Sequence, residues 1–263
     1  MPHDLRTHLV YFNEEGDASP HNHVGRPVEG TVTDISGREA EFKLDEHGFC
    51  LARQVTNVDD FLDEENVKAH YYPEIEQLLK EVTGASRVII FNHITRLSQT
   101  LDHKKAPDDQ LLARPAVKWV HLDRFSAPDA ARELIFKHAP TAAEAEKLVQ
   151  KRYQVLNIWR PIKTILRDPF GIASEVPDSD LVIMPYSTPE EKGVKYGVRA
   201  SPNHHWYYKY KQEPNEVLIF KAFDTSTSVK ETRVPHSAFT DPDEEDKAPR
   251  ESIETRALLF YDE

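Results

Sequence analysis

The sequence has a single cysteine, Cys50, among its 263 residues. An internal disulfide is therefore excluded, and the fold does not depend on an oxidising compartment. No segment approaches the run of about 20 apolar residues that a membrane-spanning helix needs. The first residues, MPHDLRTHLVYFNEEG, have neither the cationic start nor the apolar stretch of a signal peptide. We therefore expect a cytoplasmic protein with no membrane span.

Basic residues are outnumbered by acidic ones. The chain has 33 Lys and Arg against 45 Asp and Glu, which gives a formal net charge of −12. Binding to a nucleic-acid backbone depends on an excess of Lys and Arg, so this balance argues against a nucleic-acid partner. Internal repeats and low-complexity linkers are also missing. We expect one domain over residues 1–263, with strands and a helix of residues 1–87 packed on a core formed by residues 88–263.

Hydrophobic periodicity predicts the main elements. In residues 67–84, apolar residues recur at helical spacing and a glycine suits the position after the helix end: Ile75, Leu78, Leu79, Val82 and Gly84. Residues 127–152 have helical periodicity in two pieces, broken near Pro140. Strands are expected at residues 8–12, 39–49, 86–97 and 117–123, and six more strand-like segments follow residue 152. The fold class is therefore α+β, with a β sandwich or barrel flanked by helices.

The most informative motif is H-x-D, formed by His121 and Asp123 at the end of the strand predicted for VKWVHLD. Side chains at i and i+2 of a strand project from the same face, so the imidazole and the carboxylate point together into a core or a cavity. Burying two polar groups without partners costs on the order of a few kcal/mol each. A metal ion would satisfy both. The alternative is an ordinary strand pair in which a backbone carbonyl satisfies His121.

A second histidine from a later strand would complete the two-histidine, one-carboxylate set that holds Fe(II) in non-haem oxygenases. His236, in RVPHSAF, follows an apolar strand and a polar loop and is the preferred third ligand. His204 and His205, in SPNHHWYY, are its main rivals. His21 and His23 have the spacing of a ligand pair as well, but no carboxylate-bearing strand accompanies them, so we expect a loop there.

Downstream of the third histidine, Arg250 and Ser252 form an R-x-S motif at the start of the last predicted strand. If 2-oxoglutarate chelates the metal at one end, its far carboxylate needs a bidentate cation, which Arg supplies better than Lys. Arg250 and Arg256 compete for this role, and surface salt bridges are the alternative for both. Asn157 and Arg160, in NIWRPI, are further candidates for contacts with the co-substrate.

Seven segments from residue 88 to the end carry a family resemblance: FNHITR, RPAVKWVHLD, YQVLNIWRPI, HHWYYKY, NEVLIFKAFDT, RVPHSAFTDP and RESIETRALLF. With them the chain resembles the iron(II)- and 2-oxoglutarate-dependent oxygenases related to the cephamycin 7-methoxylase component and the fungal hydroxylase/desaturases. Within these it is most similar to the endoperoxide-forming branch of novofumigatonin biosynthesis. The resemblance implies a double-stranded β-helix (jelly-roll) core and His121, Asp123 and His236 as catalytic iron ligands. The chain departs from the family pattern after H-x-D, where Arg124 and Phe125 follow.

The resemblance also implies a reaction. Fe(II), 2-oxoglutarate and dioxygen would together oxidise an unactivated C–H bond of a secondary metabolite, and the specific expectation is endoperoxide formation on a fungal meroterpenoid. Aromatic residues suited to the walls of a pocket for a terpenoid or other apolar small molecule are Trp119, Trp206, Tyr207 and Tyr208.

Three alternatives stay open. The first is a hydroxylase or desaturase of another small metabolite. The second is a non-catalytic jelly-roll module that binds a small ligand, and the third is an inactive accessory subunit. Enzymes of this kind often form dimers, so a homodimer is a further expectation.

Overall fold

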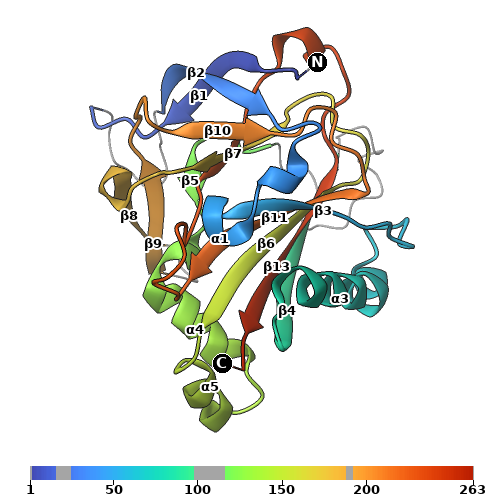
Figure 1. The fold of residues 1–263 in the computed structure, drawn as a ribbon, viewed down its shortest axis with the longest axis vertical. Helices are drawn as coiled ribbons and strands as arrows, with labels where there is room; N and C mark the ends of the chain where they lie inside the picture. Colours follow the sequence, from blue (N-terminus) through green and yellow to red (C-terminus); the bar gives the residue numbers. More distant parts are fainter. Residues whose placement is uncertain (1, 16–24, 98–115, 188–191, 263) are drawn as a thin grey trace.

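The computed structural model describes residues 2–15, 25–97, 116–187 and 192–262, and these residues form two β-sheets (Figure 1). The larger sheet has the spatial strand order β1 (Leu5–Tyr11), β2 (Arg26–Asp34), β10 (His205–Tyr208), β7 (Phe170–Ser174), β12 (His236–Ala238), β5 (His121–Leu122), β9 (Lys192–Val198) and β8 (Leu181–Ser187). The smaller sheet has the order β3 (Phe49–Arg53), β11 (Glu216–Asp224), β6 (Tyr153–Pro161), β13 (Ser252–Phe260) and β4 (Arg87–Arg96). All neighbouring strands pair antiparallel except β10 and β2, which are parallel. The predicted jelly-roll core is confirmed.

The inner faces of the two sheets enclose an apolar core. Its side chains come from strands of both sheets and from the segments between them: Ile35, Phe42, Phe49, Trp159, Ile165, Phe170, Ile172, Leu218, Phe220 and Val234. Antiparallel sheets packed face to face bury alternate residues of each strand in this way. Aromatic rings contact one another within this core. The ring centroids of Trp159 and Phe170, for example, lie 4.9 Å apart. This core borders the space between the two sheets, which also contains polar side chains.

A helix covers the outer face of the smaller sheet. After a short helix, α2 (Glu64–Asn66), and a π-helical turn at Val67–Tyr71, α3 runs from Tyr72 to Thr83 (Figure 1). Gly84 follows it in the left-handed conformation, as predicted. Leu79 is fully buried among residues of β6, β11 and β13, whereas Val82 is 39% exposed. The predicted helix is confirmed, with Val82 at the border of its buried face.

Two further helices, α4 (Pro128–His138) and α5 (Ala142–Leu148), follow β5. The break between them falls at Pro140, as the sequence predicts. Leu134 and Ile135 of α4 are buried against the ends of β6 and β13, in a cluster that includes Phe125 and Phe260. The helices therefore close the lower end of the space between the sheets (Figure 1).

The strand predicted for residues 39–49 is wrong. A 3-10 turn at Glu39–Glu41 and a short helix, α1 (Leu44–His47), occupy this segment, and β3 begins only at Phe49. Gly48 ends α1 at φ 76°, where its amide bonds the Leu44 carbonyl at 3.0 Å. A Cβ on Gly48 would lie 2.2 Å from Val234, so glycine is required here on both steric and conformational grounds. The alternation of apolar residues therefore misled the prediction, because the left-handed Gly48 closes a helical turn within the segment.

Two other predicted strands differ in extent. Only His121 and Leu122 of the segment 117–123 pair as a strand, because the chain turns immediately afterwards into a 3-10 turn at Arg124–Ser126. β4 was expected to be a buried strand, but it lies at the edge of the smaller sheet and is mostly half-buried. Residues 98–115, expected to be a polar loop, lie outside the described residues.

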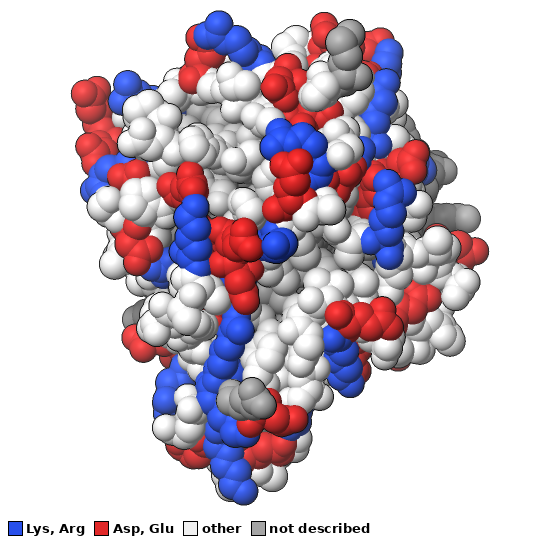
Figure 2. Space-filling model, in the orientation of Figure 1, with Lys and Arg blue, Asp and Glu red and all other residues white. Residues whose placement is uncertain are grey.

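Acidic and basic side chains are interspersed over the face shown in Figure 2, and both signs of charge border an uncharged central strip. Among the described residues, no helix has the combined length and apolar character that crossing a membrane requires.

The packing of α3 predicts a sharp contrast in stability between two of its apolar residues. Leu79→Ala should lower the free energy of unfolding by about 2–5 kcal/mol, because the cavity left behind is fully buried. Val82→Ala should change it by less than about 0.5 kcal/mol, because Val82 is partly exposed and alanine favours the helix. Urea denaturation followed by circular dichroism measures both. Equal losses for the two variants would contradict this packing.

Candidate metal centre

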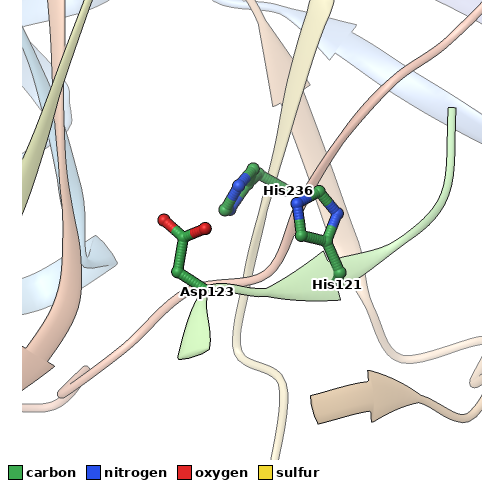
Figure 3. Close-up of side chains that lie close together, drawn as sticks. All are labelled: His121, Asp123 and His236. Carbon is green, nitrogen blue, oxygen red and sulfur yellow. The ribbon is translucent and has the colours of Figure 1, made fainter. Parts of the chain in front are cut away.

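Two neighbouring strands of the larger sheet supply the three predicted metal ligands. His236 is the first residue of β12, and its backbone pairs antiparallel with that of His121 on β5. The centroids of the two imidazole rings lie 4.4 Å apart. Asp123 follows just beyond the end of β5, and its carboxylate lies beside both rings (Figure 3). The pairing of two short strands thus brings together side chains that are more than a hundred residues apart.

The distances among these groups suit a metal ion. One potential ligand atom from each of His121, Asp123 and His236 lies within 4.8 Å of the other two. This is the one group of three such residues found in the described part of the chain. All three are sheltered, since His236 is 5% exposed and the side chain of Asp123 is 14% exposed. The H-x-D motif therefore faces the space between the sheets.

Hydrogen bonding determines which nitrogen of His121 is available. Its Nδ1 lies 2.6 Å from the carbonyl oxygen of Trp119, which can only accept a hydrogen bond, so Nδ1 carries the proton. The lone pair of Nε2 is then free for a metal ion. The ring of His236 stacks on Phe170, and a backbone hydrogen bond to Val234 orients the ring, as the Trp119 carbonyl does for His121.

The protonation states are those that metal ligands need. Burial and the adjacent His121 lower the pKa of His236 to about 3, so its ring is neutral at neutral pH. Burial alone would raise the pKa of Asp123, but Arg256, the two histidines and the Asn157 amide hold this pKa well below its usual value. A neutral imidazole and an ionised carboxylate can both bind a cation without first losing a proton. The residues present therefore fit Fe(II), for which two histidines and one carboxylate are the typical set.

Arg250 lies buried just before β13. Its guanidinium carbon is 5.4 Å from the ring centre of Trp159 and 5.6 Å from that of Phe170. Nη1 donates to the backbone carbonyl of Asp168 at 3.0 Å, while Nε is buried without a partner. Burial lowers the pKa of Arg250 to about 10, which still leaves the side chain charged at neutral pH. In the described part of the chain no carboxylate forms an ion pair with it, and Asp168 and Glu254 act on its charge only at longer range.

Arg256, the competing arginine, is paired with carboxylates through Nη2, although its Nε is also buried without a partner. Its Nη2 lies 2.5 Å from Oε1 of Glu254 and 3.5 Å from Oδ1 of Asp123. Ser252, the other member of the R-x-S motif, is the first residue of β13 and is 1% exposed. Arg250 and Arg256 were equal candidates for binding 2-oxoglutarate in the sequence analysis. The structure gives them different surroundings.

The two candidates in NIWRPI lie on opposite faces of β6. Asn157 faces the metal centre and donates from Nδ2 to Oδ2 of Asp123 at 2.5 Å. Arg160 is fully buried on the other face, where its guanidinium donates to Tyr71 of the π-helical turn and to Gln54. The structure therefore does not bring Arg160 to the metal centre, in contrast to the expectation from sequence. An offset of three residues along a strand reverses the face, which is the physical reason.

The rival histidines belong to a different network. His204 hydrogen-bonds Tyr11 through Nδ1 at 3.1 Å and Asp180 through Nε2 at 3.0 Å. The exposed His205 forms an ion pair with Glu175. Neither joins the group around the H-x-D motif.

Some features were not foreseen. Glu254, which lies two residues before Arg256 and so on the same face of β13, contributes a further carboxylate near the centre. The i, i+2 spacing of these opposite charges was the signal that could have identified it. Phe125 lies in the segment that departs from the family pattern. It is a core residue, and its ring centroid lies 5.3 Å from that of Phe91. His21 and His23 lie outside the described residues.

The environment of His204 predicts a pH dependence of stability. Burial lowers the pKa of His204 below its ordinary value of 6.5, although the Asp180 carboxylate opposes this. The unfolded chain therefore binds this proton more readily than the folded one, and stability falls as pH drops below about 6.5. The free energy of unfolding of His204→Gln should depend less steeply on pH between 7 and 5.5 than that of the wild type. Urea titrations at several pH values measure this, and an equal or steeper slope in the variant would contradict it.

Comparison with known proteins places the fold and the site in context. A family model described as "Oxidoreductase/YMDC permease-like domain" matches residues 2–260. The hydroxylase/desaturase efuI of Hormonema carpetanum is 37% identical over 98% of this chain and 96% of its own length. The alpha-ketoglutarate-dependent dioxygenase phiK of a fungal species is 38% identical over 85% of this chain and 81% of its own length.

A solved structure agrees with these relatives. The iron and alpha-ketoglutarate-dependent endoperoxidase NvfI superposes with a TM-score of 0.82 at 26% identity, covering 98% of each chain. The sequence of the corresponding Aspergillus novofumigatus dioxygenase nvfI is 29% identical over 86% of this chain and 81% of its own length. The chain therefore belongs to the family of iron(II)- and 2-oxoglutarate-dependent oxygenases that includes the fungal hydroxylase/desaturases.

Proposed function

We propose that this enzyme oxidises a C–H bond of a secondary metabolite at an Fe(II) ion held by His121, Asp123 and His236. The observation that supports this most strongly is the approach of one ligand atom from each residue to within 4.8 Å of the others. When bound, iron with 2-oxoglutarate supplies the activation of dioxygen, which no side chain can perform alone. Because only three side chains would hold the ion, positions for co-substrate and dioxygen would stay available.

We further propose Arg250 as the residue that binds the far carboxylate of 2-oxoglutarate. It is a buried guanidinium that forms no ion pair with a carboxylate of the described residues, whereas Arg256 lies within ion-pair distance of two. A buried charge in this state is costly, and a carboxylate would satisfy it through charge-assisted hydrogen bonds. The rings of Trp159 and Phe170 keep the guanidinium plane in place. Ser252, two residues after Arg250, is the first residue of β13, and we propose it as a second contact.

Aromatic side chains around the metal centre limit which molecules can reach it. Phe170 and Phe220 flank His236, and Trp119 stacks parallel to His121. Such walls keep water away from the reacting carbon and favour an apolar substrate. A fungal terpenoid is our proposal for the substrate class.

Two outcomes of the reaction have support. Endoperoxide formation on a meroterpenoid is favoured by the likeness to the endoperoxidase NvfI along nearly the whole chain. Hydroxylation or desaturation of another metabolite is favoured by relatives named hydroxylase/desaturase, such as efuI. Incubation with candidate metabolites under ¹⁸O₂ distinguishes them, because an endoperoxide retains both labelled atoms, a hydroxylated product one and a desaturated product none. The homodimer and the cytoplasmic location stay predictions.

The ligand assignment predicts the spectroscopy of three variants. Anaerobic addition of Fe(II) and 2-oxoglutarate to the wild type should produce the weak visible charge-transfer band of a chelated 2-oxo acid. His121→Ala and Asp123→Ala should abolish the band, since each removes one of three ligands. His205→Ala, an exposed change outside the centre, should retain it. A band that survives in His121→Ala but vanishes in His205→Ala would show that the ligands lie elsewhere.

The clamp assignment predicts a change in 2-oxoglutarate affinity. Arg250→Met should raise the KM for 2-oxoglutarate roughly 100-fold, because a buried charge-assisted pair contributes about 2–3 kcal/mol. Succinate release measured against 2-oxoglutarate concentration tests this. An unchanged KM in a folded Arg250→Met protein would rule out the role.

A further inference from the structure

Both oxygens of the Asp123 carboxylate have partners from the opposite sheet. Asn157 of β6 donates to Oδ2 at 2.5 Å, and Arg256 of β13 lies 3.5 Å from Oδ1. Asp123 itself lies beyond the two-residue strand β5, where the chain turns away. Backbone pairing therefore fixes the direction of His121 but not the side-chain rotation of Asp123. The contacts from the smaller sheet supply that restraint.

The two partners are built into one row across the smaller sheet. In the antiparallel register, Arg256 on β13 lies opposite Asn157 on β6 and opposite Asn92 on β4. Asn157 is fully buried and Arg256 has 12% of its side chain exposed. Side chains in such a row share one face and have little rotational freedom. The row thus presents an amide and a guanidinium to Asp123 from fixed strands.

The carboxylate of Glu254 balances the positive charge of Arg256. A guanidinium beside a metal site repels the cation and competes with it for the carboxylate. Glu254 lies 2.5 Å from Arg256 on the same face of β13 and balances that charge. With Asp123 and Glu254 negative and Arg256 positive, the cluster keeps one net negative charge for the metal. Each oxygen of Asp123 also keeps a free lone pair, because a carboxylate offers about four acceptor positions.

Arg256 and Arg250 therefore have separate tasks. Given the iron site proposed above, on which this inference rests, we propose that Arg256 and Asn157 are positioning residues that orient the Asp123 carboxylate toward the metal ion, and that Glu254 holds Arg256 in place. Arg256 touches neither co-substrate nor substrate in this role. Its effect on the reaction passes through Asp123.

Metal affinity separates this role from that of a co-substrate clamp. Co(II) binding to the full chain is measured by calorimetry for the wild type and for Arg256→Met and Arg250→Met, which form a matched pair. Arg256→Met should weaken Co(II) binding about 10–100-fold, as is typical when a group that orients a metal ligand is removed. Its KM for 2-oxoglutarate at saturating Fe(II) should stay within about threefold of the wild type. Arg250→Met should show the reverse, with unchanged Co(II) affinity.

Two results would overturn the inference. Unchanged Co(II) affinity in Arg256→Met would show that Asp123 needs no such partner, and a large rise in the 2-oxoglutarate KM would make Arg256 a clamp instead. Failure of the wild type to bind Co(II) or Fe(II) at all would instead overturn the proposed iron site itself. The two failures are therefore distinguishable.

A second variant guards against misfolding of Arg256→Met. Asn157→Leu removes the other contact to Asp123 while keeping the branched shape and the number of side-chain heavy atoms, and it should also weaken Co(II) binding with an unchanged KM for 2-oxoglutarate. A residue with only a structural role would lower the melting temperature without separating these two constants. If Asn157→Leu melts earlier yet binds Co(II) as tightly as the wild type, the positioning role is wrong.

Discussion

The site depends on one backbone pairing, between His236 at the start of β12 and His121 on β5. Both strands are very short, yet this register places the two imidazoles on the same face of the larger sheet with their centroids 4.4 Å apart. A slip of one residue would turn one ring to the outer face, because strand side chains alternate. The third ligand then follows from the i, i+2 spacing of the H-x-D motif. Everything else around the centre serves to fill, shield or charge the space that this pairing creates.

The second constraint is the balance of buried charge. Two arginines approach the centre, and in the part of the chain that the structure describes only Arg256 has carboxylate partners. Arg250 has a single backbone acceptor and two aromatic neighbours. An unpaired buried charge is costly. We therefore assign Arg256 to contacts within the protein and Arg250 to binding a ligand. Both arginines lie in or next to β13. The position of β13 between β6 and β4 therefore decides which of the two reaches the Asp123 carboxylate.

Periodicity reached a β sandwich or barrel and helix α3, and the motif residues pointed to His121, Asp123 and His236, whereas the jelly-roll class followed from the family resemblance. Sequence reasoning failed where the decisive contact is tertiary. Arg160 is close to Asn157 in sequence, yet the three-residue offset puts it on the other face of β6, where it donates a hydrogen bond to Tyr71. Residues 39–49 alternate like a strand, but Gly48 ends a helical turn there. The choice between Arg250 and Arg256 could not be made from their spacing, since it depends on Glu254 and Asp123 meeting only the second.

The central claim is that three side chains from two paired strands hold one iron atom. A crystal structure grown anaerobically with Fe(II) and 2-oxoglutarate, with anomalous data at the iron edge, tests it most directly. The account predicts one strong peak at about 2.0–2.2 Å from Nε2 of His121, a carboxylate oxygen of Asp123 and a ring nitrogen of His236. A peak beside His204 or His205, or no peak between the sheets at full metal loading, would contradict it.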